Sequence, residues 1–151
     1  MAARNVLLTH DLRTKVADFG FSTRLYFEND GTKTKKGAQQ DKFPFHSSAY
    51  EILVNGTAIL EKSDIWSFGI LMWEIFYLGT ALPYADKTAD ALGKSALVNS
   101  LKLGQRLEKP PLCPKYLYNL MLRCWELNPQ VRPTFSLVKE KLRDFLLDQL
   151  Q

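Results

Sequence analysis

Two oxygen-bearing side chains, Asn5 and Asp18, are of a type and spacing that suit metal chemistry. They flank two short apolar segments, residues 6–8 and 15–17. Magnesium is a hard cation that prefers oxygen ligands; aspartate supplies an anionic oxygen and asparagine a neutral one. Either residue by itself is more often found in a turn or at a helix cap. Their joint position around the two segments favours a metal site over two separate turn residues.

The segments around these two residues predict a short β-hairpin followed by helices. Residues 5–9 and 14–18 are expected to form strands, with a turn at 10–13. Residues 19–47 show no sustained periodicity, and so long a connection in a compact domain is usually functional or disordered. Helices are expected over residues 48–55, from Ser63 to Gly79, from Thr88 to Leu103, after Pro114 and after Pro133.

The segment from Ser63 to Gly79 is the strongest helix prediction. Ser63 is a good N-cap candidate and Gly79 can close the C-terminus. Apolar residues between them fall on every face, so the helix should be buried all round as a central axis. In the last helix we expect an inner face of Phe135, Val138, Leu142, Phe145, Leu146 and Leu150. The fold class is therefore a mainly α-helical domain with a short β-hairpin near the N-terminus.

Length and composition favour a single globular domain of 151 residues with a modest net charge of +4. Four lysines lie between residues 33 and 42, but no aromatic side chains alternate with them, so a solvated loop is favoured over a nucleic-acid site. Cys113 and Cys124 are too few for a disulfide framework and indicate reduced thiols. The longest apolar stretch, residues 65–79, is interrupted by polar residues, so no membrane segment is expected.

Six short motifs follow one another along the chain. They are Ala2-Ala3-Arg4-Asn5, Asp18-Phe19-Gly20, Ser63-Asp64-Ile65-Trp66-Ser67-Phe68-Gly69, Glu108-Lys109-Pro110-Pro111, Cys124-Trp125 and Arg132-Pro133-Thr134-Phe135. In this order and spacing they resemble the C-terminal lobe of a protein tyrosine kinase. One such motif is weak, whereas six in order are a specific signal. The resemblance covers almost the whole chain.

The resemblance implies ATP-dependent transfer of a phosphoryl group to tyrosine in a protein substrate. Asn5 and Asp18 resemble the residues that hold the Mg2+ ions on the ATP phosphates. Arg4 resembles the residue that helps to position the substrate tyrosine; an ordinary surface ion pair is the alternative. These three residues are the catalytic candidates, and ATP and Mg2+ are the expected cofactors of the intact parent.

Three further residues resemble structural supports of this site. Asp64 resembles a buried carboxylate that accepts hydrogen bonds from the catalytic-loop backbone, although a plain helix cap is also open. Glu51 and Arg132 resemble an ion pair that fastens the end of the activation segment to the helical body. That segment would run from about residue 18 to 51. Within it, Tyr26 is either a phosphorylation site or a packing aromatic.

The sequence also departs from the family pattern. The family's glycine-rich loop, strand lysine and His-Arg-Asp triplet would lie upstream of Met1. We therefore expect residues 1–151 to be a truncated kinase domain, inactive by itself and without tight ATP or Mg2+ binding. Ala49-Tyr50-Glu51 stands where Ala-Pro-Glu is usual, and residues 45–48 differ from the basic residue, Trp and Met expected there. These changes fall where a peptide substrate would dock.

Two alternatives stay open at this point. Tyr50, Ser47 and Ser48 favour a non-catalytic, pseudokinase-like interaction module, whereas Asn5 and Asp18 favour the enzyme. An incomplete gene-model fragment is the other alternative. The expected partners are a tyrosine-containing protein substrate and the kinase N-lobe, with no nucleic acid. The expected location is the cytoplasm, or the cytoplasmic part of a membrane receptor.

Overall fold

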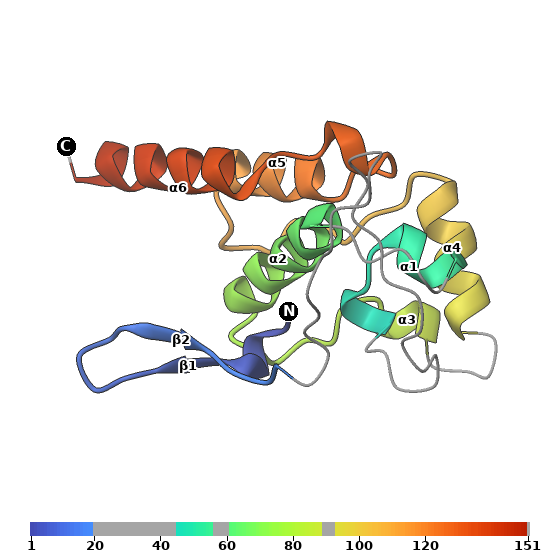
Figure 1. The fold of residues 1–151 in the computed structure, drawn as a ribbon, viewed down its shortest axis with the longest axis horizontal. Coiled ribbons are helices and arrows are strands. Elements are labelled where there is room, and N and C mark those ends of the chain that lie inside the picture. The colour runs from blue at the N-terminus through green and yellow to red at the C-terminus, as the bar shows by residue number, and fades with distance from the viewer. Residues whose placement is uncertain (20–44, 56–60, 89–92, 151) are drawn as a thin grey trace, which may run out of the picture.

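The structure, a computed structural model, describes residues 1–19, 45–55, 61–88 and 93–150, and most of these are helical (Figure 1). The α-helices are α1 (Tyr50–Asn55), α2 (Glu61–Phe76), α3 (Ala85–Thr88), α4 (Gly93–Lys102), α5 (Lys115–Cys124) and α6 (Phe135–Gln149). The described residues also contain three short 3-10 helices: η1 (Ala3–Asn5) before the hairpin, η3 (Phe45–Ser47) before α1, and η4 (Pro129–Val131) between α5 and α6. No helix within the described residues is long and apolar enough to cross a membrane.

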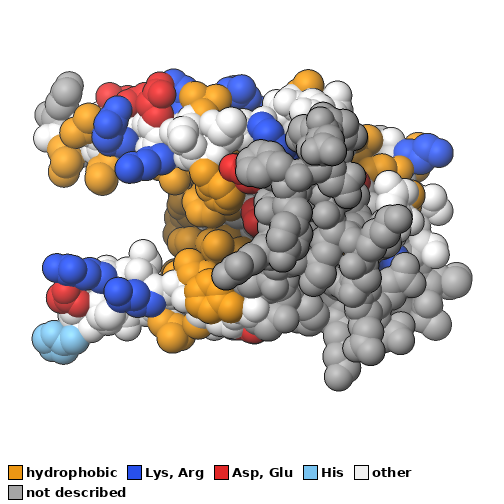
Figure 2. All heavy atoms as spheres, in the orientation of Figure 1, with side chains coloured by type: hydrophobic (Ala, Val, Ile, Leu, Met, Phe, Trp, Pro, Cys, Tyr) orange, Lys and Arg blue, Asp and Glu red, His pale blue; other side chains and the backbone are white. Residues whose placement is uncertain are grey.

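The predicted hairpin is present and projects from the helical body (Figure 1). Strands β1 (Val6–Leu8) and β2 (Thr14–Val16) are antiparallel, with Val6 opposite Val16. Strand β1 is one residue shorter than predicted at each end, whereas β2 begins at Thr14 as predicted and ends two residues early. Most apolar side chains of this region are exposed: Leu7, Leu8, Leu12, Val16 and Phe19. Figure 2 shows hydrophobic side chains on the floor of a hollow between the hairpin and α6.

Helix α2 is the axis of the fold and packs against α5 on one side. Between residues 65 and 73 it is buried almost all round, as predicted, but Ile75 near its end is 54% exposed. Ser63 is not its N-cap, because the helix begins at Glu61. Gly79 does help to close it, with φ of +70° and an N–H that donates to the Glu74 carbonyl.

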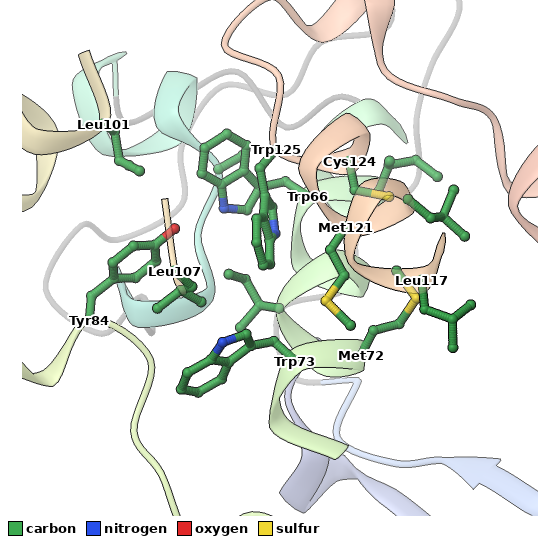
Figure 3. Close-up of a cluster of buried hydrophobic side chains, with 14 of the residues drawn as sticks. Trp66, Met72, Trp73, Tyr84, Leu101, Leu107, Leu117, Met121, Cys124 and Trp125 are labelled. Atoms are coloured by element: carbon green, nitrogen blue, oxygen red, sulfur yellow. The ribbon is translucent and has the colours of Figure 1, made fainter. Parts of the chain in front are cut away.

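The core lies where α2 meets α5, around Trp66, Trp125 and Met121 (Figure 3). Gly69 is buried at this contact. A β-carbon added at Gly69 would stand 2.6 Å from Nε1 of Trp125 and 2.9 Å from Cβ of Cys124. The two helices can therefore approach this closely only because residue 69 has no side chain.

Two helix predictions need correction. Thr88 does not open a helix that continues to Leu103; it ends α3, and α4 begins at Gly93, after residues that lie outside the described part. The predicted inner face of α6 is also wrong at both ends, because Leu146 and Leu150 are 58% and 75% exposed, and Phe135 is 37% exposed although its ring contacts Phe68. Helix α6 has 15 residues against 10 in α5, so its last turns run past its neighbour (Figure 1).

Gly69→Ala should destabilise the chain by about 1–3 kcal/mol, because the new methyl group overpacks the α2–α5 contact. Elsewhere in a helix the same change would be favourable by about 1 kcal/mol. Urea unfolding measures the difference. Trp125→Phe in the same chain removes the closest atom, Nε1, which has no hydrogen-bond partner among the described residues, and should recover part of the loss. An unchanged or raised midpoint in Gly69→Ala would show that the helices adjust freely.

Candidate functional site

The structure brings Asn5 and Asp18 together at the base of the hairpin. Nδ2 of Asn5 donates to Oδ2 of Asp18 at 3.4 Å, and the Ala17 N–H donates to the Asn5 carbonyl at 2.7 Å. Asn5 is half-buried at the end of η1, while Asp18 is exposed. Asp18 has φ of 62°, a left-handed conformation that Asp tolerates better than most residues. The pairing of the two strands thus brings together two side chains, from separate segments, whose oxygens could bind a metal ion.

This pair fits a hard divalent cation as a partial ligand set. An asparagine carbonyl and an aspartate carboxylate supply oxygen ligands on the solvent side. Within the described residues no group of three or more His, Cys, Asp and Glu side chains could enclose an ion. Magnesium commonly keeps several waters and takes further ligands from phosphate. A site with two protein oxygens is therefore more typical of magnesium bound with phosphate than of a structural metal enclosed by protein ligands. Arg4, one position before Asn5, is exposed.

The carboxylate that reaches the backbone of η1 is Glu74 and not Asp64. Oε2 of Glu74 accepts a hydrogen bond from the Ala3 N–H at 2.7 Å. Asp64 lies near the start of α2 and is exposed, and no hydrogen bond joins it to residues 1–5 in the part of the chain that the structure describes. Asp64 is nevertheless partly desolvated, which raises its pKa, while the positive charge of the Met1 amino group acts to lower it. No sequence motif includes Glu74; its one signal is a carboxylate in the last turn of a helix, where it is unfavourable.

Glu51 and Arg132 form a buried, two-pronged ion pair, as the resemblance predicted. Nη1 of Arg132 donates to Oε1 of Glu51 at 2.9 Å, and Nη2 donates to Oε2 at 2.7 Å. The side chains belong to the start of α1 and the end of η4, and Arg132 is only 2% exposed. Tyr50, which stands where Pro is usual, does not move Glu51 out of reach.

All five N–H groups of the Arg132 guanidinium have acceptors. Besides Glu51, they donate to the carbonyls of Glu126, Lys62 and Leu127. The guanidinium carbon also lies 5.0 Å from the centre of the Trp66 ring, within cation–π range. A buried charge is tolerated only when it is paired and fully hydrogen-bonded, and here both conditions hold.

Ser63 completes the surroundings of Glu51. Its Oγ donates to Oε1 of Glu51 at 2.7 Å, which explains a serine in the first turns of α2. Desolvation acts to raise the pKa of Glu51, but the hydrogen bonds from Arg132 and Ser63 outweigh it and the net pKa is lowered. The carboxylate is therefore held in its charged form.

The atypical residues 45–48 are built into the body of the domain. Ser47 and Ser48 are buried, and the Ser47 carbonyl accepts from Oγ of Ser67 at 2.9 Å. Nδ1 of His46 lies 3.0 Å from the Pro83 carbonyl, and the Phe45 and His46 rings stack. Tyr26 and most of the predicted activation segment fall within residues 20–44, which lie outside the described part.

Comparison with known proteins gives the same assignment as the motifs. A family profile described as protein tyrosine and serine/threonine kinase matches residues 1–142. The chain is 41% identical over 146 residues to the tyrosine-protein kinase receptor torso of Bombyx mori. This chain belongs to the protein tyrosine kinase family. It is also 42% identical over 142 residues to the tyrosine-protein kinase transforming protein Fps of avian sarcoma virus (strain PRCII). Its fold is that of a kinase C-lobe, mainly helical with a hairpin near the N-terminus.

The alignments cover nearly all of this tyrosine kinase chain but little of the relatives. They include 97% of the chain and 17% of the torso receptor, and 94% of the chain and 25% of Fps. For the megakaryocyte-associated tyrosine-protein kinase of Rattus norvegicus, 37% identical, the shares are 94% and 27%. The chain thus spans about a sixth to a quarter of these proteins' length.

Removing either partner of the buried pair should cost about 3–5 kcal/mol, because the other charge is left in a low-dielectric site. That is a large share of the roughly 5–15 kcal/mol that stabilises a domain. Urea unfolding of Glu51→Ala, Arg132→Ala and the double variant measures the loss, and the double variant should lose less than the sum. Lys141→Ala, which breaks only partly exposed contacts to acidic neighbours in α6, is the matched control at about 0–1 kcal/mol. Single losses below about 1 kcal/mol would contradict the pair's importance.

The contribution of Glu51 to stability should depend on pH. Its pKa lies below the ordinary value of 4.5, so its stabilising effect is full above that value and is lost as the pH falls through the depressed pKa. The difference in unfolding free energy between the unsubstituted chain and Glu51→Gln should therefore narrow on acidification from about pH 7 to about pH 3. A difference that stays constant or widens would show that the carboxylate charge is not what stabilises the contact.

Proposed function

We propose that this chain is the C-lobe of a protein tyrosine kinase whose intact parent transfers the ATP γ-phosphoryl group to tyrosine in a protein. The observation that carries the proposal is the contact between Asn5 and Asp18 at the base of the hairpin. In phosphoryl transfer the protein mainly positions the reactants and stabilises charge. Two side chains with oxygen ligands that lie next to each other beside the helical body support the first of these tasks.

In this proposal each residue of the site has a limited task. Asn5 and Asp18 hold Mg2+, which supplies positive charge that offsets the charge of the ATP phosphates. Arg4, exposed in η1, orients the substrate tyrosine. The Glu51–Arg132 pair keeps the segment after residue 44 attached to the body, so that the substrate side of the site stays in place. Tyr26 and the activation segment from about 18 to 51 remain proposals of the same kind.

The alternative is a non-catalytic interaction module, and one observation favours it. The residues that replace the usual substrate-docking pattern are buried or hydrogen-bonded: Ser47, Ser48 and His46. These contacts hold residues 46–48 against the domain body, which favours a scaffold surface over a segment that opens to dock a peptide substrate. An interaction module does not explain why Asn5 and Asp18 lie in contact, whereas metal binding in a kinase does, so we prefer the enzyme.

The metal role of Asp18 is tested with Mn2+, a paramagnetic substitute for Mg2+. Titration of the chain with Mn2+ should broaden the amide NMR signals around Asn5 and Asp18 first. Asp18→Ala should abolish that selective broadening. Asp11→Ala is the matched control, because Asp11 is an exposed carboxylate at the opposite end of the same hairpin and should leave it unchanged. Equal broadening in all three chains would contradict the proposal.

A turnover assay completes the test. The 151 residues contain neither a His-Arg-Asp triplet nor a glycine-rich loop, so the chain by itself lacks a base for the substrate hydroxyl and a cover for the phosphates. We expect no phosphorylation of a tyrosine-containing polymer with ATP and Mg2+ above a heat-killed control. Measurable turnover would mean that other residues supply the base, and the assignment of roles would have to change.

A further inference from the structure

The contact between Glu74 and Ala3 joins two segments that are 71 residues apart. Oε2 of Glu74 lies 2.7 Å from the Ala3 nitrogen, a short distance typical of a charge-assisted hydrogen bond. Glu74 is half-buried and comes from the last turns of α2, whereas Ala3 is the first residue of η1. It is a direct hydrogen bond between the central helix and the turn that ends in Asn5.

The first N–H of η1 needs an acceptor that its own segment does not provide. The first N–H groups of a helical turn have no partner inside the turn, and a side chain at the N-cap usually satisfies one of them. The N-cap here is Ala2, which has no side-chain acceptor. Ala2 is also 3% exposed, so this end of η1 is shielded from solvent. The Glu74 carboxylate takes the place of the absent cap.

The position of Glu74 in α2 is unfavourable for the helix itself. Carbonyl dipoles make the end of a helix negative, so a carboxylate in the last turns is repelled. Helix α2 has no basic side chain in its last turn to compensate. A residue that violates a local preference is expected to have a compensating role elsewhere, and the hydrogen bond to Ala3 supplies one.

We propose that Glu74 is a positioning residue for the metal-binding pair: its carboxylate fixes η1 on α2 and thereby fixes Asn5 opposite Asp18. This inference rests on the proposed function, since it assigns a support to the same site. The connection is short. Ala3 and Asn5 are the two ends of η1, the Asn5 N–H donates to the Ala2 carbonyl at 3.0 Å, and the Asn5 carbonyl accepts from Ala17 at 2.7 Å. A shift of η1 would therefore change the separation of Asn5 and Asp18.

The test compares Glu74→Ala and Glu74→Gln with Glu61→Gln in the full chain. Glu61 is an exposed carboxylate at the other end of α2, so its variant controls for loss of a charge from the same helix. Hydrogen exchange of the Ala3 and Asn5 amides should accelerate about fivefold to tenfold in Glu74→Ala. Glu74→Gln keeps an acceptor oxygen at the same reach and should retain part of the protection.

The second readout separates positioning from general stability. The Mn2+ concentration that broadens the Asn5 and Asp18 signals should rise about threefold to tenfold in Glu74→Ala. This loss of affinity is no larger than the loss of about tenfold or more that follows when a metal ligand loses its own hydrogen-bond partner. The urea midpoint and the exchange rates of α5 and α6 should match those of Glu61→Gln. Unchanged exchange at Ala3, or an equal acceleration of all amides, would overturn the inference.

Failure of the proposed function would look different. If Mn2+ does not broaden the Asn5 and Asp18 signals even in the unsubstituted chain, this pair does not bind metal. Glu74 then cannot be a positioning residue for a metal site. The exchange rates of Ala3 and Asn5 then still decide whether Glu74 holds η1. If Mn2+ binds selectively but Glu74→Ala leaves its affinity unchanged, the metal role stands and the positioning role falls.

Discussion

A buried ion pair between Glu51 and Arg132 connects the parts of this domain that are far apart in sequence. It joins the start of α1 to the end of η4, and the carbonyls that Arg132 also contacts belong to α2 and to the segment after α5. Desolvating a guanidinium is costly, and the cost is offset here only because all its donors and the Trp66 ring are in place together. Each of these segments therefore depends on the others for its position.

Helix α2 extends this dependence across the molecule. Its first turns carry Ser63 and the Lys62 carbonyl, which contact the buried pair. Its middle presents Gly69 to α5 at a distance that no other residue would allow. Near its end Glu74 holds the Ala3 amide. One helix thus contacts the ion pair, the core and the turn that carries Asn5, so the polar end of the hairpin is placed by the same element that organises the core.

The features that sequence motifs located well are those in which residue type limits the chemistry. Residue type and spacing single out Asn5 and Asp18 as a pair, and the hairpin brings them together. Glu51 and Arg132 were expected in contact and are. The sequence predicts the roles of Ser63 and Asp64 less well. A serine or an aspartate near the start of a helix is equally suited to the N-cap position. The local sequence does not reveal that α2 begins two residues before Ser63, or that the Ser63 hydroxyl donates to the Glu51 carboxylate.

The sequence by itself determined the kinase family, the helical class of the fold, the hairpin and the residues that form the buried ion pair. These follow from residue chemistry and from short-range periodicity, which operate within a few turns. Only the tertiary structure decided that Glu74, and not Asp64, reaches η1, and that the end of α6 runs past α5 into solvent. Such contacts depend on where elements end in space and how closely they pack, and a chain's local pattern does not encode those distances.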